Sequence, residues 1–157
     1  MTSPPAMDED FMLQALAIAT RAKAEGEPPF GALLVARTGL IVAGASDEVS
    51  RGRDLSLHAE LNVVRRACQE LGPDLRGSTL YTTVEPCPMC FTAAWLARVW
   101  RVVFGATMDA VFEATGGAQR ELRFPAASLN AFSGEPLILV GGVLAKQCLW
   151  PFQSDRS

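Results

Sequence analysis

Two cysteines stand two residues apart in the stretch TTVEPCPMCF, residues 82–91, and a proline precedes each of them. Pairs with this spacing occur in redox dithiols, in closed structural zinc sites and in catalytic metal sites. A redox pair needs one exposed, activated thiol, whereas a metal site needs further ligands elsewhere in the chain. The remaining residues therefore decide which chemistry Cys87 and Cys90 can do.

The single histidine of the chain, His58, offers a third metal ligand. It lies in the sequence L-H-A-E, with Glu60 two positions further on. A lone histidine is more often an ordinary core or surface residue than a ligand. The combination of H-x-E with a later P-C-x-x-C is, however, typical of zinc deaminases. We therefore expect zinc to be bound by His58, Cys87 and Cys90.

The ligand count separates a structural zinc from a catalytic one, because a closed structural site needs four protein ligands. Cys68 lies ten residues beyond His58 on the same predicted helix. That is a rise of ~15 Å, too far for both side chains to reach one ion. Cys148 lies in an apolar stretch and is expected to be a buried structural thiol. Aspartates or Glu60 could still close the shell, but three ligands and a water form the simpler, catalytic site.

Such a zinc ion would lower the pKa of its bound water and make hydroxide available near neutral pH. Glu60 could take the proton from this water and pass it to a ring nitrogen and then to the leaving amine. In isolation, Glu60 would instead be interpreted as a solvated acid that complements a helix dipole. Beside the predicted zinc ligands, we expect it to be the catalytic acid and base.

The elements that must position these residues alternate between helix and strand patterns. A hairpin turning at Thr38-Gly39 is expected at 29–46, and residues 108–121 suggest one or two helical turns broken at two glycines. Pro151 is expected to kink or end the last helix. The predicted helices are 8–26, 56–71, 88–99 and 144–150, and the other predicted strands are 78–85, 101–107 and 136–143.

This order predicts a single α/β domain over residues 8–157, with a partly parallel sheet covered by helices on both faces, after a flexible segment 1–7. In such sheets, chemistry usually lies where helix N-termini meet the carboxyl ends of strands. His58 and the cysteine pair both fall at predicted helix starts, which favours one shared site.

Composition limits the partners and the compartment. The chain has 157 residues, a net charge of −3 and a pI near 5.2, and its Lys and Arg residues form no cluster. Nucleic acid is therefore an unexpected partner. No apolar run approaches the ~18 residues of a membrane span, and the acidic N-terminus is unlike a secretory signal. Four cysteines are few for a disulfide scaffold, so we expect reduced thiols and a cytoplasmic protein.

The motifs H-A-E at 58–60 and E-P-C-P-M-C at 85–90, with PFGALLV at 29–35 and RVVFGA at 101–106, resemble the cytidine deaminase superfamily. The match is closest to the branch of bacterial guanine deaminases, fungal cytosine deaminases and tRNA adenosine deaminases. This resemblance implies a three-layer α/β/α fold with a mixed sheet of about five strands, a zinc cofactor, hydrolytic release of ammonia and a homodimer. It also implies that the backbone N–H of Ala59 helps to bind the reacting edge of the substrate.

Two further residues are candidate substrate contacts. Phe30 follows Pro29 as in free-base deaminases, where the ring could line the base pocket, although an inward strand residue is equally expected. Asp47 stands where guanine and tRNA deaminases carry an asparagine that contacts the substrate. An ionised aspartate only accepts hydrogen bonds, so Asp47 favours a substrate that presents N–H groups. Its alternative role is that of a turn residue at the end of the hairpin.

The segment after the last motif strand is where guanine deaminases contribute an acidic residue to the pocket. Asp109 or Glu113 could serve here. Trp150 and Phe152 could close the pocket, although core packing or a dimer contact is the more usual role of such residues.

These observations predict a zinc-dependent hydrolytic deaminase of a free nucleobase, guanine or a related purine or pyrimidine. One alternative is a tRNA or nucleoside deaminase acting on adenosine or cytidine. Another is a catalytically silent, zinc-stabilised binding protein. A redox protein would instead form a reversible disulfide between Cys87 and Cys90 and would not need His58.

Overall fold

The structure of the protein is a computed structural model that describes residues 5–153. Its first helix, α1 (Pro5–Ala24), begins inside the segment 1–7 that the sequence predicts to be flexible. Residues 5–7 are therefore helical, and residues 1–4 lie outside the described part of the chain.

A five-stranded mixed sheet forms the centre of the molecule, in the order β2-β1-β3-β4-β5. β1 is antiparallel to both β2 and β3, whereas β3, β4 and β5 run parallel to one another. The predicted mixed sheet of about five strands is thus confirmed. The strands are β1 (Gly31–Val35), β2 (Ile41–Ser46), β3 (Thr79–Val84), β4 (Arg101–Ala106) and β5 (Ile138–Val140).

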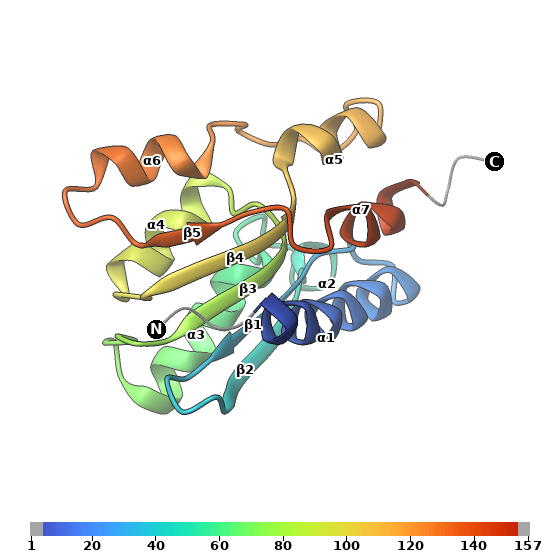
Figure 1. Ribbon diagram of the computed structural model, residues 1–157. Coiled ribbons are helices and arrows are strands. Elements are labelled where there is room, and N and C mark those ends of the chain that lie inside the picture. The colour runs from blue at the N-terminus through green and yellow to red at the C-terminus, as the bar shows by residue number, and fades with distance from the viewer. Residues whose placement is uncertain (1–4, 154–157) are drawn as a thin grey trace.

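Helices cover both faces of this sheet, which confirms the three-layer α/β/α fold (Figure 1). α1 and α7 (Ala145–Gln153) pack on one face, and α3 (Ala59–Leu71) packs on the other beside α4 (Pro88–Leu96). α5 (Met108–Ala114) contacts α7, and α6 (Ala126–Phe132) contacts α4. The short helix α2 (Val49–Gly52) follows β2 directly.

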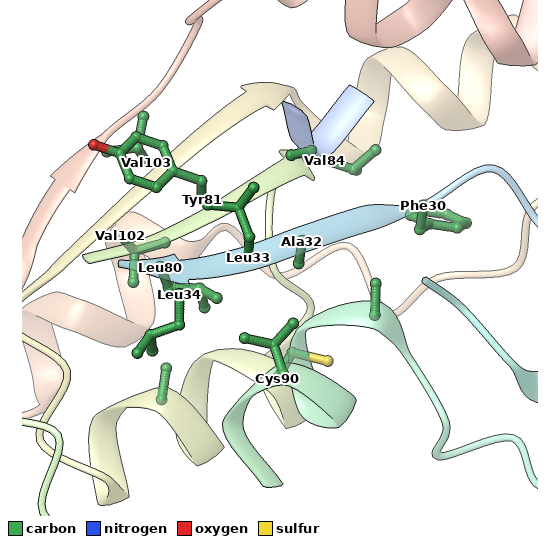
Figure 2. Packing of buried hydrophobic residues seen from close by; sticks show 14 of the residues in the cluster. Phe30, Ala32, Leu33, Leu34, Leu80, Tyr81, Val84, Cys90, Val102 and Val103 are labelled. Atoms are coloured by element: carbon green, nitrogen blue, oxygen red, sulfur yellow. The ribbon is translucent and has the colours of Figure 1, made fainter. Parts of the chain in front are cut away.

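The side chains of the central strands alternate between the two faces because successive residues of a strand point in opposite directions. Figure 2 shows Leu33, Tyr81 and Val103 on the face opposite to that of Leu34, Leu80 and Val102. All six are 2% exposed or less. Both faces of β1, β3 and β4 are therefore core, and the site must lie at an end of the strands.

A buried ion pair fastens α1 to the sheet. The Nη1 atom of Arg101 donates to Asp8 Oδ1 at 2.8 Å, and the hydroxyl group of Tyr81 donates to the same oxygen at 2.8 Å. Asp8 and Arg101 are only 5% and 2% exposed. Because each charge needs the other once water is excluded, this contact fixes α1 in one place on the sheet.

The structure differs from the sequence-based expectation in four elements. The helices α2 and α6 were not predicted, and β5 covers only Ile138–Val140 because the Gly141-Gly142 pair ends it. α7 does not end at Pro151 but continues to Gln153, the last described residue. In the last turn, a missing N–H costs one hydrogen bond, while burial of Pro151 and Phe152 favours the helix. In the described part of the chain, every helix is too short or too polar to cross a membrane.

Candidate active site

Two helix N-termini on the same face of the sheet deliver the predicted metal ligands. His58 is the residue before α3, and Cys87 is the residue before α4, with Pro88 in the first turn of that helix. Both N-cap residues have extended backbones. β3 ends at Val84, so the cysteine pair follows directly from the carboxyl end of a central strand.

The ligand atoms of His58, Cys87 and Cys90 lie within 4.8 Å of one another, although His58 is 29 positions away from Cys87 in the sequence. The Nδ1 atom of His58 is 3.5 Å from Cys87 Sγ and 3.6 Å from Cys90 Sγ. A tetrahedral zinc ion with usual Zn–S and Zn–N bond lengths separates these atoms by about 3.6 Å. The donor set and its spacing therefore fit zinc and leave a fourth coordination position.

The same three residues share protons when no metal is bound. The hydrogen bonds from Cys90 and His58 lower the pKa of the Cys87 thiol to about 4. The contact with Cys87 raises the pKa of His58 to about 9, and it also raises the pKa of Cys90. A metal ion must displace these protons, because it binds thiolate and neutral imidazole.

Glu60 is the second residue of α3 and is buried. Its side chain is 3% exposed, and its Oε1 atom is 2.9 Å from the hydroxyl oxygen of Thr82 on β3. Burial raises the pKa of Glu60 to about 7, with a further contribution from the negative charge of Cys87. A carboxyl group with a pKa near neutrality can both take up and release a proton.

The three predicted substrate contacts, Ala59, Asp47 and Phe30, are all buried. Ala59 is the first residue of α3, so its backbone N–H has no acceptor within the helix. Asp47 follows β2, is 4% exposed, and accepts a 3.0 Å hydrogen bond from the Val49 N–H through Oδ1. Phe30 is buried, and its ring packs edge-on against Phe152 with 5.1 Å between centroids.

The carboxyl group of Asp47 interacts electrostatically with the site. Burial raises the pKa of Asp47, partly offset by the hydrogen bond from Val49 and by the nearby charge of His58. The charge of Asp47 thus interacts with that of His58. The hydrogen bond from Val49 also fits the alternative role of Asp47 as a turn residue.

The loop that carries Asp47 is held by two polar side chains that sequence reasoning did not single out. Asn62 on α3 donates through Nδ2 to the carbonyl oxygens of Ser46 and Leu57, at 3.0 and 3.2 Å. The buried Glu27 accepts from the backbone N–H groups of Ser50 and Arg51 in α2. Neither role has a signal in the sequence, because the partners are 5 to 24 positions away and are backbone atoms.

The 107–121 segment carries three acidic residues that differ in exposure. Asp109 and Glu113, the two named from the sequence, are both exposed, and Asp109 pairs with Arg123 at 3.0 Å. Glu121 is half-buried. Burial raises its pKa, and the charges of Cys87, His58 and Asp47 all act on it. It lines a shallow hollow of about 570 Å³ with Asp109, Leu122, Arg123 and Phe124.

Of the three remaining residues named from the sequence, two are buried and one is exposed. Cys148 is fully buried, and a Cβ atom at Gly105 would lie 2.5 Å from its sulfur, so this thiol fills a tight contact between α7 and β4. Phe152 is buried against Phe30, whereas Trp150 is 67% exposed.

The comparison with known families decides the class of the protein. Residues 5–106 match the model of the cytidine and deoxycytidylate deaminase zinc-binding region. This stretch includes β1, β3, the two cysteine ligands Cys87 and Cys90, and the H-A-E motif. The chain belongs to the cytidine and deoxycytidylate deaminase family.

Several curated proteins are similar to the chain. A tRNA-specific adenosine deaminase of Bacillus subtilis is 38% identical over 90% of this chain and 83% of its own length. A tRNA-specific adenosine deaminase of Agrobacterium fabrum is 41% identical over 61% of this chain and 63% of its own length. The chain also matches a fifth of a tRNA(Ile)-lysidine synthase of Deinococcus deserti, at 40% identity.

Solved structures lead to the same family. The guanine deaminase of Nitrosomonas europaea superimposes with a TM-score of 0.79 at 26% identity, over 98% of this chain and 85% of that one. A structure from a study of tRNA:A34 deaminases, which edit A to I at the wobble position of transfer RNA, gives 0.77 at 28% identity, over 90% and 98%.

The protein is therefore a hydrolytic deaminase of the cytidine deaminase family with zinc as its cofactor. The redox and non-enzymatic interpretations of the cysteine pair do not hold. The prediction of a free nucleobase as substrate is less well supported than its alternative, because the similar curated relatives include tRNA-specific adenosine deaminases.

Proposed function

We propose that this deaminase acts on adenosine in tRNA and converts it to inosine. The observation that carries the proposal is the similarity to the tRNA-specific adenosine deaminase of Bacillus subtilis, at 38% identity over 90% of the chain. Such a similarity extends beyond the zinc motifs into the regions that surround the site. A homodimer, a cytoplasmic location and a single domain over residues 8–157 stay predictions.

In this proposal, His58, Cys87 and Cys90 hold the metal. When bound, zinc supplies a Lewis acid that lowers the pKa of water in the site. Glu60 takes one proton from water and delivers it to the ring nitrogen beside the reacting carbon. It later takes the remaining proton from the added hydroxyl group and delivers it to the departing amine. Water is consumed, the carbonyl group forms and ammonia leaves. The Ala59 N–H, which has no acceptor within α3, binds the reacting edge of the base.

Asp47 and Glu121 are proposed to recognise the rest of the base. Both are carboxyl groups at the site, and the pKa of each is raised by burial. An ionised carboxylate accepts hydrogen bonds, so the two favour the N–H or O–H groups of a nucleoside. The backbone N–H of Asp47 donates to the Phe30 carbonyl oxygen, so the two residues are held together. The buried ring of Phe30 is proposed to support this part of the site.

Exposed apolar side chains close to the site residues in sequence support a substrate larger than a free base. Leu55 lies three positions before His58 and is 85% exposed, and Leu122 follows Glu121 and is 74% exposed. Apolar side chains gathered beside a site are usually covered by a partner. An RNA loop could cover them, and so could a second copy of the chain.

A free aminated base is the second candidate, and the acidity of the site favours it. Asp47 and Glu121 together provide acceptors for several N–H groups, as guanine presents. The net charge of −3 also disfavours a polyanion. The guanine deaminase of Nitrosomonas europaea shares the fold.

Steady-state kinetics separate the two candidates. Ammonia release by the zinc-loaded protein is measured with an adenosine-containing tRNA, with adenosine and with guanine. The proposal predicts the highest kcat/KM for the tRNA, with activity that falls as salt rises. A higher kcat/KM for guanine, without salt dependence, would replace it by the second candidate.

A further inference from the structure

One carboxylate, that of Glu85, joins the starts of two helices. Glu85 Oε1 accepts a hydrogen bond of 3.1 Å from the backbone N–H of Met108, and Glu85 Oε2 accepts one of 3.0 Å from the backbone N–H of Ala126. Met108 is the first residue of α5, and Ala126 is the first residue of α6. Neither N–H has an acceptor within its own helix, so Glu85 supplies it.

The segment between these two points, residues 108–126, carries Glu121. Within this segment, the Arg123 guanidinium lies 3.8 Å above the centroid of the Phe112 ring. That contact fastens the loop around Glu121 to α5. The attachment of α5 and α6 to the strand ends then determines where the loop lies.

Glu85 is itself fixed to the part of the chain that delivers the metal ligands. It follows β3 directly, and its backbone N–H donates to the Ala106 carbonyl oxygen at the end of β4, at 2.8 Å. Cys87 lies two residues further on. One residue thus connects the cysteine ligand pair to both ends of the segment that bears Glu121.

We propose that Glu85 is a positioning residue that fixes the position of Glu121 relative to the cysteine ligands. The inference rests on the proposed function, because it takes Glu121 as a substrate contact. A carboxylate is required since its two oxygens accept from two N–H groups at once. A glutamine has one acceptor oxygen, and its NH₂ group would face a backbone N–H. Glu85→Gln therefore loses one of the two attachments while keeping nearly the same shape.

Hydrogen exchange of the zinc-loaded protein tests the attachment without any substrate. Mass spectrometry of peptides that cover the starts of α5 and α6 is compared between the parent, Glu85→Gln and Glu70→Gln. Glu70 is an exposed residue of α3 and serves as the matched control. In Glu85→Gln, exchange at one or both helix starts should be about tenfold faster or more, with one zinc per chain retained. Unchanged exchange over residues 108–126 overturns the proposal.

Glu85→Asp provides a conservative comparison because it keeps two acceptor oxygens on a shorter side chain. It is expected to retain more protection of α5 and α6 than Glu85→Gln does. If the aspartate variant exchanges as fast as the glutamine variant or faster, the two-acceptor account is wrong.

A double-mutant cycle tests whether Glu85 acts through Glu121. With adenosine-containing tRNA, or with guanine if only guanine is deaminated, Glu85→Gln and Glu121→Gln should each raise KM by about tenfold. The effect on kcat should stay within about threefold, and the double variant should resemble Glu121→Gln. If the increases in KM of the two single variants multiply in the double variant, Glu85 does not act through Glu121. If the parent deaminates neither substrate, the proposed function fails, while the exchange experiment still decides the role of Glu85.

Discussion

The hydroxyl oxygen of Thr82 lies 2.9 Å from Glu60 Oε1, and this contact joins the middle of the sheet to the proposed proton-transfer group. Both residues are buried. Thr82 also lies 3.0 Å from the Val84 carbonyl oxygen, so its single hydrogen is shared between two acceptors. β3 therefore positions Glu60 directly as well as delivering the cysteines.

The Thr82 hydroxyl should control the pH dependence of activity. Burial raises the pKa of Glu60 to about 7, and the Thr82 hydrogen bond lowers it. A bound dication lowers it further, so the acid limb of kcat/KM should lie below pH 7. Thr82→Val removes a donor to the charged form, which raises the pKa, and the limb should move to higher pH by about one unit.

A pH profile of kcat/KM for the parent and Thr82→Val checks this. The variant should lose more activity at pH 6 than at pH 8, because Glu60 must be ionised to take up a proton. A limb that does not move, or that moves to lower pH, contradicts the direct contact between Thr82 and Glu60.

Zinc content should depend on the three clustered ligands and on no other cysteine. Cys87→Ala and His58→Ala each leave two ligands, so the metal should be lost on dialysis, to less than about a tenth of an ion per chain. Elemental analysis measures it. Cys68→Ala is the control and should keep one ion per chain. Loss of zinc from the control would mean that the site is not the one described.

Asp47→Asn should weaken binding of the base. The amide oxygen can still accept from the Val49 N–H, so the loop should keep its shape. The other oxygen becomes an NH₂ group, which cannot accept a hydrogen bond from an N–H or O–H group of the substrate. The KM of the substrate that is deaminated should therefore rise by about threefold to tenfold. An unchanged or lower KM in the variant contradicts the proposed role of Asp47.

The buried pair of Asp8 and Arg101 should contribute strongly to stability. Asp8→Asn leaves the guanidinium buried without its counter-charge, which should cost about 3–5 kcal/mol of unfolding free energy. Asp74→Asn breaks the exposed pair with Arg76 and should cost far less, because water screens both charges. Denaturant unfolding of zinc-loaded protein compares the two. Equal losses would show that burial is not what makes the Asp8 pair important.

The sequence predicts the ligand cluster well because short-range spacing carries the signal. His58, Glu60, Cys87 and Cys90 each lie at or beside a helix start, where hydrophobic periodicity and proline mark the boundary. The mixed sheet follows from the same periodicity. These features depend on neighbours in the chain rather than on distant contacts.

Glu121 and Glu85 could not be predicted in this way. Glu121 lies in an irregular loop without periodicity, and only the tertiary fold lets the charges of Cys87 and His58 act on it. The roles of Glu85 depend on backbone N–H groups 23 and 41 positions away. The small helix α6 was missed because it has seven residues, of which only Ala126 is buried, so it carries no long apolar pattern. The helical turn at Pro151 was missed because burial of Pro151 and Phe152 outweighs local propensity there.

The most direct test of the account is the detection of inosine in tRNA. Zinc-loaded protein is incubated with a tRNA that carries an anticodon adenosine, the RNA is digested to nucleosides, and inosine is measured by mass spectrometry. The account predicts inosine with the parent protein and a rate about 10²- to 10⁴-fold lower with Glu60→Gln, which should keep its zinc. No inosine from the parent, under conditions in which guanine is converted to xanthine, would contradict the proposed substrate.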